Sequence, residues 1–135
     1  MFHKEDTVQK INTMSPSTLA FMGDSVYGLL VREKLCRVNR PSGELHSLSV
    51  KFVSAPRQAD AYSIISDLLS ENEVAVFKRG RNFHTQNTPK SSSAKDYHTA
   101  TGLETLFGYL YLNNEDERLK TLFDIIWEKQ SENIE

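Results

Sequence analysis

Residues 19–27 read LAFMGDSVY and place a single carboxylate, that of Asp24, in a run that is otherwise apolar or small. Aspartate is a poor residue in the middle of a helix, because its carboxylate competes for backbone hydrogen-bond donors. Gly23 costs about 1 kcal/mol relative to alanine in a helix interior, but it lets another helix or a ligand come close to the backbone. The two residues together predict a close approach at Gly23, with Asp24 beside it.

The residues around this stretch predict one long helix. Ser15 is a typical N-cap, and Pro16 suits the first helical position. From there to about Leu35, apolar residues recur with helical spacing, namely Leu19, Met22, Val26, Leu29 and Leu30.

The rest of the chain also predicts helices, and no stretch alternates as a strand does. The expected helices span about 44–53, 54–69, 71–80, 96–112 and 115–130. The third begins with a capping box at Ser70, and Asp96 is the expected cap of the fourth. Residues 84–95, HTQNTPKSSSAK, are the one obvious loop. The pattern predicts an all-α helical bundle in a single domain over residues 1–135, with its core at about 14–130.

Glu104 repeats the pattern of Asp24. It lies among apolar and small residues, with Gly102 and Gly108 on either side. If the glycine-bearing faces pack together, the two carboxylates converge in the interior, and their repulsion raises the pKa of one of them. A hard divalent cation relieves that conflict, and Mg²⁺ typically takes one or two protein carboxylates. The alternative is a buried ion pair for each acid, with Arg32 or Lys95 as partner.

The composition narrows the class of protein. The chain has 135 residues, a formal net charge of −2 and one cysteine, Cys36, so an internal disulfide and a cysteine zinc cluster are excluded. The first residues lack the apolar core of a signal peptide, and no apolar run approaches the roughly 18–20 residues of a membrane helix. We therefore expect a cytoplasmic protein with no membrane partner and no organic cofactor.

The segments around both acids resemble a known family. Residues 19–27 resemble the signature helix of the ribonuclease III family, and TGLETLFGYLYL at 101–112 resembles its second conserved helix, which carries a metal-binding glutamate. Between them, VSAPRQA at 53–59 and FKRGRN at 77–82 resemble the Mini-III branch. The resemblance runs from about residue 14 to residue 112. It implies a ribonuclease III-type endonuclease domain.

The resemblance also implies an activity, a cofactor and partners. The reaction would be hydrolysis of double-stranded RNA, leaving 3′-hydroxyl and 5′-phosphate ends, and its expected substrate is the 23S ribosomal RNA precursor. Asp24 and Glu104 would be the catalytic residues and the ligands of Mg²⁺, for which Mn²⁺ substitutes. A homodimer would place one site against each strand, with helix residues near Phe21, Tyr27 and Val31 lining the contact.

The chain departs from the larger members of the family in two respects. They carry further acids at the positions of Ala20 and Thr101. Their absence here argues against a site in which protein side chains supply most of the ligands of two metal ions. We also expect no separate double-stranded-RNA-binding domain, so the catalytic domain itself would hold the RNA.

A basic segment, residues 78–95, is expected to bind the RNA. No acid occurs between residues 78 and 95, whereas acids outnumber bases beyond residue 113. The expected RNA-binding residues are Lys78, Arg79, Arg81, Asn82, His84, Lys90 and Lys95. Composition alone fits a solvated surface loop equally well.

Two other functions are compatible with the residues. The chain would be a non-catalytic double-stranded-RNA-binding protein if Ala20 and Thr101 mark a lost active site. A helical protein-interaction module is the third hypothesis, but it leaves both glycine-flanked acids unexplained.

Overall fold

The structure is a computed structural model that describes residues 11–83, 93–132 and 134. Within these residues every regular element is helical, with six α-helices and two short 3-10 helices. The elements are η1 (Ile11–Thr13), α2 (Pro16–Leu35), α3 (Ser42–Phe52), α4 (Ala55–Ile65), η2 (Ser66–Leu68), α5 (Glu71–Arg81), α6 (Ala94–Leu112) and α7 (Asp116–Gln130). The predicted all-α class is therefore confirmed.

Local capping signals explain where most helices begin. The Ser15 side chain accepts a hydrogen bond from the backbone N–H of Thr18, and Ser70 and Glu73 form the predicted capping box of α5. The prediction for α6 was wrong in one detail. Its cap is Ser93, whose side chain accepts from the backbone N–H of Asp96, so Asp96 lies in the first turn. Both residue types cap helices well, and the sequence pattern does not choose between them.

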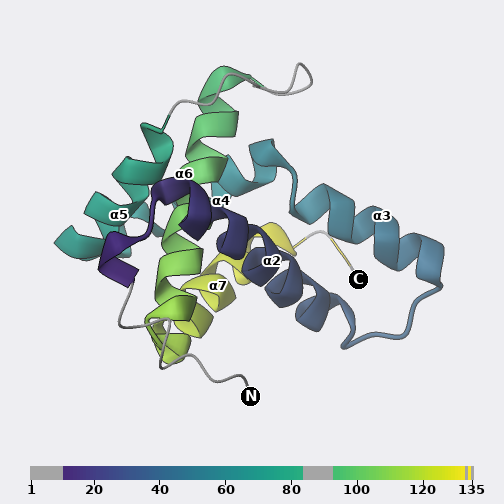
Figure 1. Ribbon diagram of the computed structural model, residues 1–135. Helices are drawn as coiled ribbons and strands as arrows, with labels where there is room; N and C mark the ends of the chain where they lie inside the picture. Colours follow the sequence, from purple (N-terminus) through teal and green to yellow (C-terminus); the bar gives the residue numbers. More distant parts are fainter. Residues whose placement is uncertain (1–10, 84–92, 133, 135) are drawn as a thin grey trace.

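The central element is α6, which contacts α2, α4, α5 and α7 (Figure 1). Its side chains are buried on more than one side, as expected of a helix that is apolar all round. Four apolar side chains are fully buried, namely Leu103, Leu106, Phe107 and Leu110, and so is the polar Thr105. α3 lies at the edge of the molecule and contacts only α2 and α4 to any extent (Figure 1). The core therefore forms around α6.

Two glycines let the backbones of α2 and α6 touch. A Cβ atom at Gly23 would overlap the carbonyl oxygen of Glu104, and one at Gly108 would overlap the carbonyl oxygen of Leu19. Any larger residue at either position would push the helices apart. The predicted close approach at Gly23 is confirmed, and the helix that approaches it is the one that carries Glu104.

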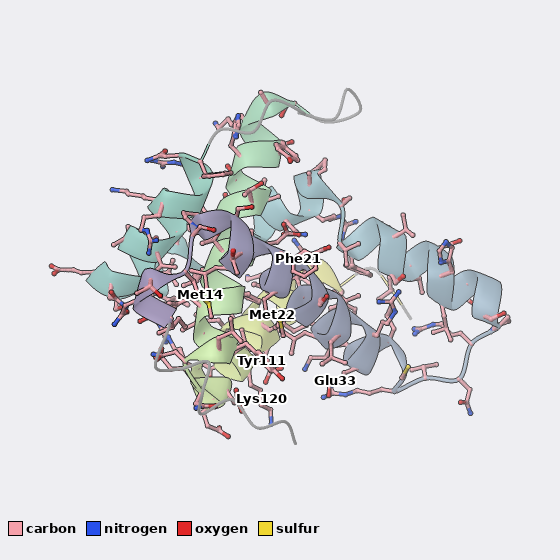
Figure 2. The ribbon with its side chains drawn as sticks, viewed as in Figure 1. Met14, Phe21, Met22, Glu33, Tyr111 and Lys120 are labelled. Carbon is pink, nitrogen blue, oxygen red and sulfur yellow. The ribbon has the colours of Figure 1, made fainter. Side chains whose placement is uncertain are left out.

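α2 is apolar on most sides but buried on only one. Leu19, Val26, Tyr27 and Val31 lie in the core, whereas Phe21 is 82% exposed (Figure 2). Leu29, which shares the apolar spacing, is also exposed. None of the helices in the described ranges is long and apolar enough to cross a membrane.

Candidate active site

Asp24 on α2 and Glu104 on α6 face the same surface hollow, which has a volume of about 280 Å³. Its wall also contains Ala20, Phe83, Tyr97 and Thr101. The two acids are 80 positions apart in the sequence, and the glycine-mediated contact between α2 and α6 brings them together. The structure corrects one expectation about them. Asp24 is exposed and Glu104 is half-buried, so only one of the two carboxylates lies in the interior.

The pKa of Glu104 is raised to about 7. Burial of the carboxylate is the largest cause, because desolvation penalises the charged form. A hydrogen bond from Gln58 opposes the shift, while the charge of Asp24 and a hydrogen bond shared with it add to the shift. The predicted conflict between the two carboxylates is therefore present, and Glu104 is the residue affected.

Neither acid forms the ion pair that was the alternative interpretation. In the described part of the chain, the ion pairs join Lys34 to Asp124, Arg40 to Glu44 and Arg118 to Glu73. Neither Arg32 nor Lys95 pairs with Asp24 or Glu104 there. The site therefore has two acids and no protein cation to balance them among the described residues.

Gln58 is a site residue that the sequence analysis missed. Its side-chain amide donates to Glu104 Oε2 at 3.1 Å and to the carbonyl oxygen of Val53 at 3.0 Å. The side chain is 2% exposed, and it follows the buried stripe of Ala61 and Ile65 along α4. A glutamine on the apolar stripe of a helix was the signal that could have identified it, because a buried amide needs a partner.

The hydroxyl of Tyr27 is buried within range of the charge of the same carboxylate. Burial raises its pKa, and the charges of Asp60 and Glu104 raise it further. Its oxygen has no hydrogen-bond partner among the described residues. Tyr27 and Val31 are each 1% exposed, so the expectation that they line a dimer contact is wrong. Both side chains fill the core of their own chain.

The two positions where larger relatives carry acids lie at the same hollow. Ala20 is buried there, and the Thr101 hydroxyl donates to the carbonyl oxygen of Tyr97 at 3.0 Å. No group of three or more histidine, cysteine, aspartate or glutamate side chains able to hold a metal occurs in the described ranges. Asp24 and Glu104 are therefore the acids available in these ranges for a cation at this hollow.

The predicted RNA-binding residues divide into three groups. Arg81, Asn82 and Lys95 line a groove of about 750 Å³ between α4, α5 and α6, together with Asp60 and Asp96. Lys78 is exposed on α5 outside this lining, and Arg79 donates to the carbonyl oxygen of Met14 at 3.2 Å. His84 and Lys90 lie outside the described residues. The groove thus carries both signs of charge.

Comparisons with known proteins identify the family of the chain. Residues 17–115 match the ribonuclease III domain. The chain is 44% identical over 120 residues to the Mini-ribonuclease 3 of Thermoanaerobacter sp. (strain X514), covering 88% of this chain and 84% of that protein. It is 39% identical over 135 residues to the Mini-ribonuclease 3 of Clostridium tetani, covering 96% of this chain and 89% of that protein. A crystal structure of a protein from Fusobacterium nucleatum matches with a TM-score of 0.81 at 28% identity, over 90% of this chain and 98% of that chain.

The chain therefore belongs to the ribonuclease III family and is an endoribonuclease. Enzymes of this family are typically metal-dependent. Within the family, the chain is a member of the Mini-ribonuclease 3 branch. The hypotheses of a non-catalytic RNA-binding protein and of a protein-interaction module are set aside.

Proposed function

We propose that this endoribonuclease cuts double-stranded RNA by hydrolysis, with Mg²⁺ held by Asp24 and Glu104 and with Mn²⁺ able to substitute. The observation that carries the proposal is the convergence of these two carboxylates at one open hollow without a balancing protein cation among the described residues. When bound, the metal would polarise the scissile phosphate and lower the pKa of the attacking water.

The residues at the hollow fit such an ion. The raised pKa of Glu104 reflects burial and the nearby charge of Asp24, which a divalent cation would offset. Mg²⁺ dehydrates reluctantly and usually keeps several waters beside one or two carboxylates and phosphate oxygens. The neutral side chains of Ala20 and Thr101 supply no further charged ligand, which suits such a water-rich coordination shell.

The chemistry assigned to the chain is simple in outline. The oxygen of water forms a bond to phosphorus, the 3′ oxygen leaves with a proton, and the products are a 5′-phosphate and a 3′-hydroxyl. Asp24, which is exposed, would hold the cation from the α2 side of the hollow, and Glu104 would hold it from the α6 side. The enzyme contributes position and electrostatic stabilisation, the usual means of catalysing phosphoryl transfer.

The catalytic assignment is tested by Asp24→Asn and Glu104→Gln, which remove a charge with little change in shape. We expect each variant to lose at least about a hundredfold in cleavage of a long RNA duplex, the scale of losing one electrostatic stabiliser. Duplex binding and thermal unfolding should remain near wild type. Asp67→Asn, at an exposed acid on η2, is the matched control and should cleave normally. Near-native cleavage by either site variant would overturn the assignment.

We assign RNA binding to residues of the catalytic domain. Arg81, Asn82, Lys95 and the exposed Lys78 would meet phosphates and 2′-hydroxyls, together with Arg79, His84 and Lys90. Two aromatic residues line the wall of the acidic hollow, namely Phe83 within the basic segment and Tyr97 just beyond its end. This continuity supports the proposal, because a duplex held at the basic segment reaches the acids.

A homodimer is also part of the proposal. One site cuts one strand, and a two-fold axis would present a second site to the other strand. Phe21 supports this, because a phenylalanine that is 82% exposed on the helix that carries Asp24 is a typical anchor of an interface.

In the cytoplasm, the proposed substrate is the 23S ribosomal RNA precursor. Mature 23S ends in cells depleted of the enzyme would contradict that substrate.

A further inference from the structure

We propose that Gln58 is a positioning residue that orients the Glu104 carboxylate as a metal ligand. This inference rests on the proposed function, because it assigns Gln58 a task at the proposed metal site. Gln58 donates from α4 to Glu104 Oε2 on α6 at 3.1 Å and to the Val53 carbonyl oxygen at 3.0 Å. One amide therefore connects the end of α3, the start of α4 and the acidic hollow.

Two acceptors determine which way the amide faces. Glu104 Oε2 accepts one hydrogen bond from the Gln58 nitrogen, and the Val53 carbonyl oxygen accepts the other. The reversed amide would place its own oxygen against both acceptors, leaving three oxygens without a hydrogen between them. The NH₂ group of Gln58 is thus directed at Glu104, where it engages Oε2.

The amide is held in place by its surroundings. The backbone N–H of Gln58 donates to the Ser54 carbonyl oxygen at 2.9 Å within the first turn of α4. The Gln58 side chain is 2% exposed, and hydrogen bonds are stronger in such a low-dielectric environment. Ligands of metals are oriented by hydrogen bonds of this kind from outside the coordination sphere.

The neutrality of glutamine matters at this position. An arginine or lysine here would balance Glu104 and compete with a metal ion for it, whereas an amide orients the carboxylate without cancelling its charge. The Gln58 oxygen is buried and has no hydrogen-bond partner among the described residues, an arrangement that costs folding free energy. A purely structural position would be served as well by an apolar side chain. The hydrogen bond to Glu104 accounts for an amide at this position.

The test uses Gln58→Met, which keeps the length of the side chain but removes the donor, in the full-length protein. Mn²⁺ binding to RNA-free protein, followed by electron paramagnetic resonance, should weaken by about 10- to 100-fold, the usual effect of losing such a partner. The Mg²⁺ concentration for half-maximal cleavage should rise in parallel. We expect kcat at fixed Mg²⁺ to fall while KM for the RNA duplex stays within about twofold.

Gln130→Met is the matched control. The Gln130 amide bridges α7 to α4 in the same manner, donating to the Arg57 carbonyl oxygen at 2.8 Å and to Asp60 Oδ2 at 3.0 Å. It does not contact Glu104, so its loss should leave the metal dependence unchanged while lowering thermal stability. Equal metal affinity in Gln58→Met and the wild type would overturn the positioning proposal.

Gln58→Asn keeps the experiment decisive if the methionine variant does not fold. It retains an amide but is one methylene shorter, so it cannot span both acceptors, and it should also bind Mn²⁺ more weakly. Unchanged Mn²⁺ affinity in this variant would again overturn the proposal. Failure of the proposed function looks different. In that case Mn²⁺ binding to the wild type would be insensitive to Asp24→Asn and Glu104→Gln.

Discussion

Glu104, which is half-buried, and Glu73, which is buried, show that the partners of an enclosed carboxylate decide its chemistry. The pKa of Glu104 is raised to about 7, chiefly by burial. Glu73 is also enclosed, but the guanidinium of Arg118 donates to both of its oxygens, at 2.8 and 2.9 Å. Hydrogen bonds from Arg118 are the main cause that lowers the pKa of Glu73, against the opposing effect of burial. The first carboxylate is suited to binding a cation, and the second stabilises the fold.

The Glu73 pair makes stability depend on pH. Because its folded pKa is below the ordinary value of 4.5, its stabilisation is complete above that value and is lost as pH falls through the folded pKa. We expect Glu73→Gln to cost about 1–2 kcal/mol at pH 7, a figure reduced by the partial exposure of Arg118. The difference from wild type in thermal unfolding should shrink toward pH 3.

The control for this prediction is Glu71→Gln, at an exposed acid in the same first turn of α5. It should change the melting temperature only slightly at either pH. A Glu73→Gln difference that stayed constant down to pH 3 would show that the lost interaction is not ionic.

At the scale of whole elements, the crossing of α2 and α6 controls the site. Gly23 and Gly108 remove the side chains that would separate the helices, and Asp24 and Glu104 lie on either side of this contact. The site is therefore assembled by backbone contact. A change at the crossing should affect stability and activity together.

Gly108→Ala tests this coupling. The added methyl group would overlap the Leu19 carbonyl oxygen and press on the backbone nitrogen of Gly23, so α2 must shift. We expect a loss of about 2–3 kcal/mol in urea unfolding, the typical scale of overpacking, together with reduced cleavage. Gly43→Ala on α3 is the control, because nothing lies within 4 Å of the added atom. It should be neutral or slightly stabilising.

At the scale of the whole molecule, Phe21 links the active-site helix to assembly. The side chain is exposed beside the hollow that holds Asp24, so a partner that covered it would lie next to the site. We expect Phe21→Ser to be folded but monomeric in sedimentation experiments, with weaker cleavage of both strands of a duplex. Leu68→Ser, at an exposed apolar residue on η2, should leave the assembly unchanged. A dimeric Phe21→Ser variant would place the interface elsewhere.

Much of the fold was predictable because its signals are local. Ser15 with Pro16 and the Ser70 capping box act within one helical turn, and the apolar spacing of α2 correctly places Leu19 and Val26 in the core. The start of α6 was not fixed by its local sequence, because Ser93 and Asp96 are both of residue types that cap helices well. The exposure of Asp24 was not predictable, because it depends on which face of an apolar helix meets α6.

The sequence by itself determined the helices, the two glycine-flanked acids and the family to which the chain belongs. These features reside in short stretches of the chain and in their order. Only the tertiary structure decided that Asp24 is exposed, that Glu104 is half-buried with a raised pKa, and that the Gln58 amide bonds to Glu104. The physical reason is that burial and hydrogen bonding depend on which helix faces meet, and three helices distant in sequence meet at this site.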